Sequence, residues 1–353
     1  MTARTATRTA AGAGTPWAEG RLLTVQPRQP SVLFGRMYED PAVELAAFPP
    51  PAARVLCIAS SGDTAAALAA AGYDVTAVDL NPAQLDYARG RLQAGAPAVP
   101  GSAERLLATG RAAAGALLPA WRPSALERFL RLDDPAQQAR HWRRTLDGPG
   151  LRLFLAASLR PAGALAVGLR PPFRGVVPAR FDAVLRARLA RGFARHPNAA
   201  NPWAWRLLLG REMPGGEPRG RDLPGRDLTG GDLPGRDLPG GGLIGRDLPE
   251  GDLPGGGAAT AGPTQGTVRL LAGDVVDHLE RSPAGHYDAV TLSNVLDGPG
   301  PEFARRLRTA VRHAVRPGGV VVLRSIREPG PAGPGAAAED RSLLWGVVRV
   351  VRP

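Results

Sequence analysis

The chain has 353 residues and a formal net charge of +12, and all 44 basic residues are arginine. This length allows one large domain or two smaller ones, each with a sizeable core. Arginine is spread along the chain and aromatic residues make up only 5% of it, whereas a nucleic-acid interface gathers arginine on one face with interleaved aromatics. The composition therefore argues against nucleic acid as a partner.

The N-terminal residues 1–30 carry no strong periodic pattern, and we predict a disordered tail there. The alternative is an organelle transit peptide, since the first 18 residues contain Arg, Thr and Ala but no acidic residue. The single cysteine, Cys57, lies in an apolar run and is expected to be buried. One cysteine and the absence of an apolar stretch of transmembrane length favour a soluble, cytoplasmic protein.

The first strand–turn–helix pattern begins at Arg54. Residues Arg54–Ala59 predict a strand, and a tight turn leads into an alanine-rich helix over residues 64–71. Residues Tyr73–Leu80 predict the second strand, and Asn81 followed by Pro82 predicts the start of the next helix. Residues 31–83 are therefore expected to form the first part of a cofactor-binding α/β domain.

No strand signal is found in residues 84–214, where arginine-rich amphipathic segments occur near residues 123–144 and 181–195. We predict a helical insertion here that binds the acceptor substrate. Residues 215–263 follow a five-residue Gly-Arg-Asp-Leu-Pro period. Proline after leucine removes a backbone donor from any repeating coil, so a disordered surface loop is favoured over a pentapeptide-repeat β-helix.

Strand signals return in residues 264–353, which are expected to complete the α/β domain. A helix between Phe303 and Val315 is expected to end at the corner Arg316–Gly319, because Pro-Gly-Gly stops a helix. The alternation of strands and helices predicts an α/β fold with a doubly wound, Rossmann-like sheet of the methyltransferase type and a helical insertion. The apolar runs that predict the later strands are Thr267–Leu271, His286–Leu292, Gly319–Arg324 and Trp345–Val351.

The turn after the first predicted strand consists of small residues, which let the backbone approach a ligand closely. It contains neither G-x-G-x-x-G nor lysine, so dinucleotide and P-loop nucleotide sites lose support. The predicted cofactor-binding residues of this turn are Ala59, Ser60, Ser61, Gly62 and Asp63.

Asp79 ends the second predicted strand and is followed by Leu80 and Asn81. A carboxylate at this position can accept hydrogen bonds from both hydroxyls of a ribose. Gly273 and Asp274, after a later strand, are expected near the adenine amino group. Helix or turn capping would also explain each of these acidic residues, but their order along the chain predicts an adenosine-containing cofactor, S-adenosylmethionine.

Several motifs together are distinctive, and the chain resembles the S-adenosylmethionine:diacylglycerol 3-amino-3-carboxypropyl transferases of betaine-lipid synthesis. The resemblance covers most of residues 31–353 apart from the repeat block. Its motifs are Phe34–Pro41, Val55–Asp63, Val78–Gln84, Asn201-Pro202 with Gly210, Leu292–Asp297, Arg324-Ser325 and Asp340–Gly346.

This resemblance implies that an oxygen nucleophile attacks the carbon attached to sulfur and that 5′-methylthioadenosine leaves. It adds Ser293 and Asn294 to the expected cofactor site. The candidate catalytic residues are Tyr38, Glu39, Asp40 and Asp297; helix or turn capping is the alternative role of the acidic ones. The chain departs from the family in two places: it has Arg211 where family members often carry an aromatic residue, and its helical region diverges. These departures affect the expected acceptor site more than the expected cofactor site.

Two other functions remain open at the level of sequence. One is methyl transfer to a small molecule with the same cofactor, and the other is a non-catalytic cofactor-binding or scaffold protein. The expected acceptor is a lipid or another small hydroxylated molecule, and nothing in the sequence indicates an oligomeric state.

The segment Leu151–Leu169 is apolar but interrupted at Arg160-Pro161, which divides it into two arms too short to span a bilayer. Flanking arginines predict contact with lipid phosphates at the inner membrane surface. A pair of core helices joined at Arg160-Pro161 is the alternative.

Overall fold

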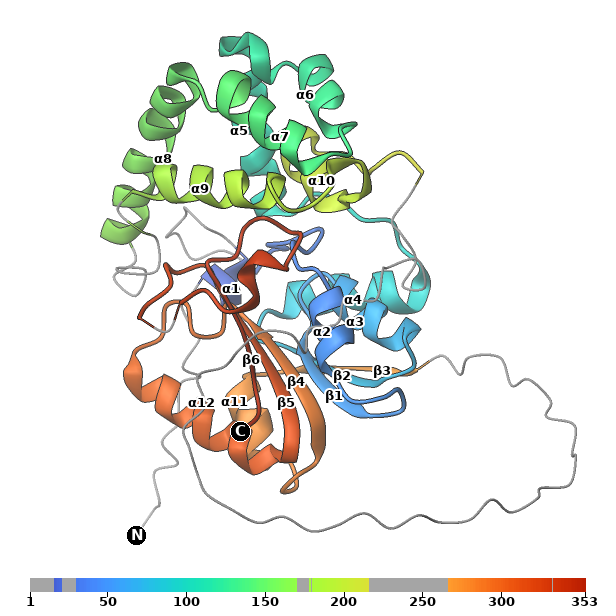
Figure 1. Cartoon of the computed structure of the whole chain (residues 1–353). Coiled ribbons are helices and arrows are strands. Elements are labelled where there is room, and N and C mark those ends of the chain that lie inside the picture. The colour runs from blue at the N-terminus through green and yellow to red at the C-terminus, as the bar shows by residue number, and fades with distance from the viewer. Residues whose placement is uncertain (1–15, 21–29, 170–177, 179, 216–265, 332) are drawn as a thin grey trace, which may run out of the picture.

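The computed structural model describes residues 16–20, 30–169, 178, 180–215, 266–331 and 333–353. Figure 1 shows two parts, an α/β domain around one sheet and a helical region above one end of that sheet. Most of the repeat block and residues 1–15 lie outside the described residues.

The sheet has six strands in the order β3-β2-β1-β4-β5-β6. The first five in this order run parallel, and the edge strand β6 is antiparallel to β5. Every predicted apolar run overlaps one strand, which confirms the α/β, Rossmann-like prediction. The strands are β1 (Arg54–Ile58), β2 (Asp74–Asp79), β3 (Val268–Ala272), β4 (Tyr287–Ser293), β5 (Val315–Ser325) and β6 (Val347–Val351).

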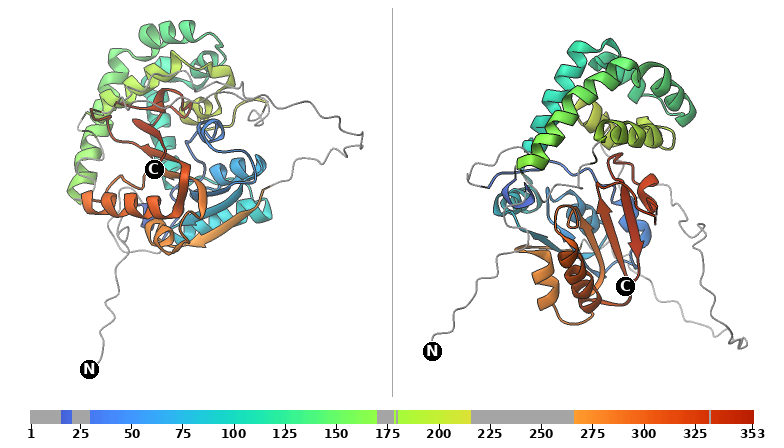
Figure 2. Two further views of the ribbon diagram at one scale, coloured as in Figure 1. Left: turned by 60° about the horizontal axis from the view of Figure 1, so that its bottom comes forward. Right: turned by 90° about the vertical axis from the view of Figure 1, so that its left-hand side faces the viewer.

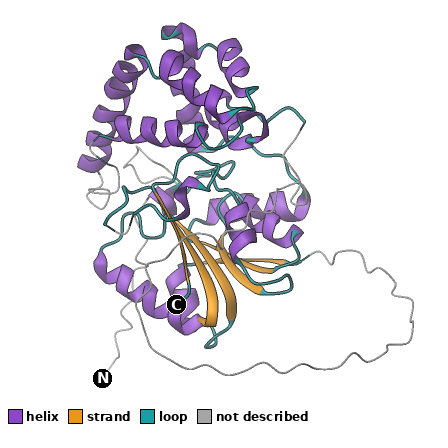
Figure 3. Cartoon of the chain, in the orientation of Figure 1, coloured by secondary structure: helices purple, strands orange, loops and turns teal. Residues whose placement is uncertain are grey.

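Helices cover both faces of the sheet, as Figure 3 shows by colour. The crossovers from β1 to β2 and from β2 to β3 place α3 and α4 on the same face as α2, and the later crossovers place α11 and α12 on the other. Because both faces are covered, the central strands are apolar throughout, and Val55, Leu56 and Cys57 are all fully buried. The helices are α2 (Ala42–Ala47), α3 (Asp63–Ala70), α4 (Pro82–Ala94), α11 (Val275–Arg281) and α12 (Pro301–Ala314).

The Pro-Gly-Gly segment has a different role from the one predicted. Helix α12 ends at Ala314 and β5 begins at once with Val315. The register steps from the pair Tyr287–Val315 to the pair Ala289–Val320, so the extra residues bulge out of the strand. Gly318 lies in this bulge and has φ = +76°, a backbone conformation that favours glycine. The segment thus reshapes the start of β5 and does not form a corner before it.

The helical region consists of helices inserted between α4 and β3, and Figure 2 shows it from two further sides. Its own apolar core is formed around Phe129, Trp142, Phe193 and Trp205. The helices are α5 (Ser102–Leu117), α6 (Pro123–Leu130), α7 (Pro135–His141), the π-helical segment Trp142–Leu146, α8 (Pro149–Leu169), α9 (Phe181–Phe193) and α10 (Pro202–Leu209).

Polar contacts attach this region to the segment that follows β5. The guanidinium of Arg188 on α9 donates to the carbonyls of Leu344, at 2.6 Å, and Ile326, at 2.8 Å. The Asn201 amide donates to the Arg341 carbonyl at 2.9 Å. The helical region therefore lies at the carboxyl end of the parallel strands, where ligands bind in folds of this type.

Residues Leu151–Leu169 do not form the two arms expected from Arg160-Pro161. They belong to the single helix α8, which contains Pro161. Pro161 and Ala157 are both exposed, so water can solvate the Ala157 carbonyl that loses its helical donor. Among the described helices, none has the length and apolar character needed to cross a membrane.

Part of the predicted N-terminal tail has defined structure. Residues Pro16–Glu19 form the short helix α1. The Trp17 ring stacks on Phe34 with 6.3 Å between centroids, and its Nε1 donates to the Asp297 carbonyl at 3.1 Å. The sequence pattern missed this helix because the contacts that anchor it, those of Trp17 among them, are made with residues remote in sequence.

Candidate functional site

A cleft opens at the carboxyl ends of β1 to β4, the position that the fold predicts for a ligand. Its empty volume is about 760 Å³, counting the open solvent at its mouth. Apolar side chains form most of the wall, and polar groups lie at the strand ends. The lining residues are Trp17, Leu33, Phe34, Ile58, Ser60, Val78, Asp79, Leu80, Gln84, Gly273, Asp274, Val275, Ser293, Asn294, Val295, Pro299 and Phe303.

Asp79, the last residue of β2, has both carboxylate oxygens held by backbone amides. Its Oδ2 accepts from the N–H of Ser60 and its Oδ1 from the N–H of Asn81, each at 2.9 Å. Burial raises the pKa of Asp79 to about 7, although these amides favour the charged form. A ligand that donates hydroxyl protons to this carboxylate would further stabilise its charged form.

The loop after β1 is fixed by Gln84, which the sequence analysis did not assign to the site. Its Nε2 donates to the carbonyls of Ser60, at 2.8 Å, and Phe34, at 2.9 Å. Its Oε1 accepts from the N–H groups of Leu33 and Phe34. Gln84 therefore joins the segment before α2 to the loop at the cleft. The sequence signal that could have identified Gln84 is its position in the first turn of the helix that follows Asp79.

Gly273 and Asp274 line the cleft beyond β3, as their predicted contact with adenine requires. Asp274 also caps α11, because its Oδ1 accepts from the N–H groups of Val276 and Asp277 at 2.8 and 3.2 Å. In the described part of the chain, no hydrogen bond reaches its Oδ2. Capping and ligand binding are therefore compatible at this residue.

Ser293 is the last residue of β4 and Asn294 follows it, and both line the cleft. Asn294 has φ = +60°, a left-handed conformation that asparagine tolerates better than most residues. Its N–H donates to the Arg324 carbonyl at 3.1 Å, which fixes this turn to β5. The cleft thus brings together predicted residues from the ends of four strands.

The described residues that line the cleft do not include Ala59, Ser61, Gly62, Asp63 or Asn81. Asn81 instead caps α4 by accepting from the N–H groups of Ala83 and Gln84. Gly62 has φ = +84° and makes the sharp turn into α3. These residues shape the loop, and the polar groups that reach the cleft come from their neighbours.

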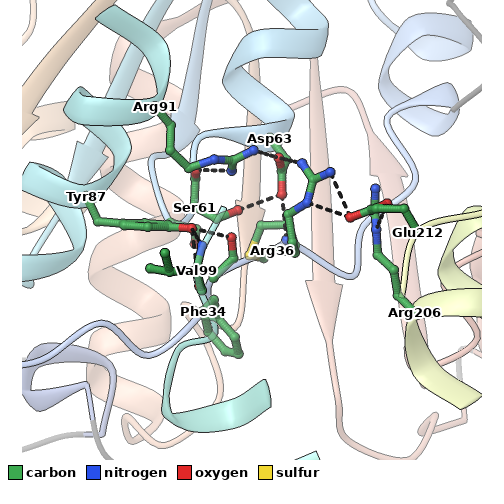
Figure 4. A network of polar contacts seen from close by, with 12 residues as sticks. Phe34, Arg36, Ser61, Asp63, Tyr87, Arg91, Val99, Arg206 and Glu212 are labelled. Atoms are coloured by element: carbon green, nitrogen blue, oxygen red, sulfur yellow. Dashed lines mark hydrogen bonds and ion pairs between the residues drawn. The ribbon is translucent and has the colours of Figure 1, made fainter. Parts of the chain in front are cut away.

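Asp63 belongs to a polar network that Figure 4 shows, with Arg36 lying between Asp63 and Glu212. Its carboxylate accepts from the Arg36 guanidinium and the Met37 N–H, both at 2.8 Å, and pairs with Arg91 at 2.7 Å. Burial opposes ionisation, but the hydrogen bond from Arg91 and the charge of Arg36 keep the pKa of Asp63 below its ordinary value. Asp63 therefore connects the Phe34–Pro41 segment to the loop that follows β1.

The side chains of Tyr38, Glu39 and Asp40 do not converge. Tyr38 packs against the core of the helical region, and burial raises its pKa to about 12. Asp40 forms a two-point ion pair with Arg341, with Oδ1 to Nη2 at 2.7 Å. Glu39 is buried and its Oε2 accepts from the Thr64 hydroxyl at 2.8 Å.

A buried ion cluster lies below the Tyr38–Asp40 segment. The Arg324 side chain is fully buried and pairs with Glu44 through both oxygens and with Asp340 at 2.8 Å. It also donates to the Asp40 carbonyl at 2.9 Å. Such a cation needs all of these acceptors to offset its loss of hydration. Arg324 therefore fixes the backbone from which Glu39 and Asp40 project.

Asp297 lies in the loop between β4 and α12 and is held by the last residue of β5 and the residue after it. Its Oδ1 accepts from the Ser325 hydroxyl at 2.6 Å and its Oδ2 from the Ile326 N–H at 3.0 Å. Burial raises the pKa of Asp297 above its ordinary value. Its carbonyl accepts from Trp17, so it supports the wall of the cleft.

We found no match to this chain among protein-family models, curated proteins or solved structures. Among the described residues, no cluster of three or more His, Cys, Asp or Glu side chains is arranged to hold a metal ion. The cleft, a buried carboxylate at the end of β2 and an ordered loop after β1 are therefore the features on which a function has to rest.

Proposed function

We propose that the chain is an S-adenosylmethionine-dependent transferase that moves the 3-amino-3-carboxypropyl group to a hydroxyl of a diacylglycerol-like acceptor. The observation that carries the cofactor assignment is Asp79, a buried carboxylate that lines the cleft with two backbone amides orienting its oxygens. An oriented carboxylate of this kind suits the paired hydroxyls of a ribose.

The order of the strands supports one orientation of the cofactor. Gly273 and Asp274 follow β3, Asp79 ends β2, Ser60 follows β1 and Ser293 ends β4, and these four strands are neighbours in that order. Three strand spacings span about 14 Å. Adenine over β3, ribose over β2 and the amino-acid end over β1 and β4 would use every polar group along this line.

The transferred group is proposed from the family resemblance. The acceptor hydroxyl would form a C–O bond to the carbon attached to sulfur, while the C–S bond breaks and its electron pair stays on sulfur. The hydroxyl proton passes to a base, and 5′-methylthioadenosine leaves. The apolar wall that includes Phe34, Val295 and Phe303 is compatible with a lipid-like acceptor presented by peripheral contact with a membrane.

One experiment separates this reaction from methyl transfer. The purified protein is incubated with S-adenosylmethionine and diacylglycerol in mixed micelles, and the nucleoside products are separated. We expect 5′-methylthioadenosine to accumulate only with the acceptor present. S-adenosylhomocysteine as the product would indicate methyl transfer, and absence of both, together with no binding of the cofactor, would favour a non-enzymatic protein.

A further inference from the structure

Glu39 is buried to 93% of its surface, yet one of its carboxylate oxygens lacks a partner. Its Oε2 accepts from Thr64, whereas no hydrogen bond from the described residues reaches Oε1. A buried acceptor without a donor destabilises the folded state, and a charged one does so more strongly. The free oxygen therefore requires an explanation beyond the fold.

The charges around Glu39 are unbalanced. Glu44, Asp340 and Asp40 share the cluster with Glu39, and the guanidinium groups of Arg324 and Arg341 face them. The side-chain ion pairs of these two arginines are made with the other three acids. Neither arginine pairs directly with Glu39, which is subject only to the longer-range attraction of Arg324. The cluster holds two more carboxyl groups than cations, and burial raises the pKa values of Glu39 and Asp340 above their ordinary values.

Glu39 lies at the β1–β4 side of the ligand site. Thr64, its donor, is in the first turn of α3, directly after the loop that follows β1. The hydroxyl of Ser293, at the end of β4, lies close enough to the Glu39 carboxylate to favour its charged form, and Ser293 lines the cleft. Glu39 is not among the described residues that line the cleft, and its Oε1 is enclosed. A cationic group placed over the ends of β1 and β4 would therefore lie beside Ser293 and would reach Oε1 after a shift of the side chains that cover it.

We propose that Glu39 binds the α-ammonium group of the amino-acid end of the cofactor, a role that rests on the proposed function. The ammonium would supply the missing hydrogen bond to Oε1 and would favour the charged form of this carboxyl group. Glu39 is then a residue that positions the transferred group, because it fixes the amino-acid end while the ribose is held at Asp79.

Calorimetry with three ligands tests this assignment in wild type and in Glu39→Gln. S-adenosylmethionine and S-adenosylhomocysteine carry the ammonium, whereas 5′-methylthioadenosine does not. We expect Glu39→Gln to weaken the first two by a similar factor of about 10 or more and to leave the third unchanged. Asp79→Ala is the matched comparison, since it removes a ribose contact and should weaken all three.

Other outcomes overturn the assignment in distinct ways. Loss of affinity for S-adenosylmethionine alone would place Glu39 at the sulfonium, and equal loss for all three ligands would indicate a structural role. Unchanged binding with lost turnover would make Glu39 the base. Wild type that binds none of the three overturns both this assignment and the proposed function.

A ligand analogue gives the same test without a substitution, in case Glu39→Gln fails to fold. In this analogue of S-adenosylhomocysteine, hydrogen replaces the α-ammonium group. We expect the wild type to bind it about 10-fold or more weakly than S-adenosylhomocysteine. Equal affinity for the two compounds would show that no protein carboxylate receives the ammonium.

Discussion

The backbone N–H of Ser60 donates a 2.9 Å hydrogen bond to Oδ2 of Asp79, which links the loop after β1 to the end of β2. Neighbouring parallel strands bring these residues together although they are 19 positions apart. The bond orients the carboxylate toward the cleft before any ligand arrives. The proposed binding of a ribose at Asp79 would therefore need little rearrangement of this carboxylate.

Replacing Asp79 with alanine should weaken binding of S-adenosylmethionine by about 1.5–3 kcal/mol, the range for hydrogen bonds to a charged group. Titration calorimetry measures the change. Asp86→Ala is the control, because this exposed aspartate of α4 lies outside the cleft. An Asp79→Ala protein with the affinity of wild type would remove the residue from the site.

The raised pKa of Asp79, about 7, predicts a pH-dependent stability. A carboxyl whose pKa is higher in the folded state favours folding at low pH, and this contribution falls as pH rises from about 4 to about 7. Asp79→Asn lacks this titration. The free energy of unfolding of the ligand-free variant, taken relative to that of wild type, should therefore increase by about 2 kcal/mol between pH 5 and pH 7. Denaturant unfolding across this range measures the difference, and a difference independent of pH would contradict the raised pKa.

Arg324→Met should destabilise the fold by about 3–5 kcal/mol, because it leaves the carboxylates of Glu44 and Asp340 buried without their cation. The matched control is Arg131→Met, whose exposed pair with Glu127 should contribute less than about 1 kcal/mol. Urea unfolding monitored by circular dichroism compares the two. Similar losses in both variants would mean that burial of the Arg324 cluster adds nothing.

Trp17→Ala should lower the affinity for S-adenosylmethionine by about 1–2 kcal/mol, because the indole forms part of the cleft wall and stacks on Phe34. A truncation that removes residues 1–15 and keeps Trp17 is the control and should bind like wild type. If removal of the indole leaves the dissociation constant unchanged, α1 has no part in the site.

Leu153→Asp tests whether the acceptor is presented at a membrane. The Leu153 side chain on α8 is 73% exposed, so the substitution should change stability by less than about 0.5 kcal/mol. Wild type should co-sediment with anionic vesicles in a salt-sensitive manner, and the variant should bind them less. Wild type that ignores such vesicles at low salt would favour a soluble acceptor.

Local sequence was sufficient to predict the parts of the fold that depend on periodicity and turn chemistry. Apolar runs such as Arg54–Ile58 identified the strands, since parallel strands buried on both faces must be apolar throughout. Asn81 with Pro82 identified the start of α4, because capping is a contact between residues two or three apart. The positions of Asp79 and Asp274 at strand ends followed from the same patterns.

Tertiary structure alone decided which side chains meet. Asp40 pairs with Arg341 and Arg324 with Glu44, across 301 and 280 positions, and no local pattern encodes such partners. Trp17 joined the cleft for the same reason, through Phe34 and Asp297. The adjacent residues Tyr38, Glu39 and Asp40 have different roles because their neighbours in space differ. Sequence determined where polar groups occur, and packing determined which of them remained without a partner.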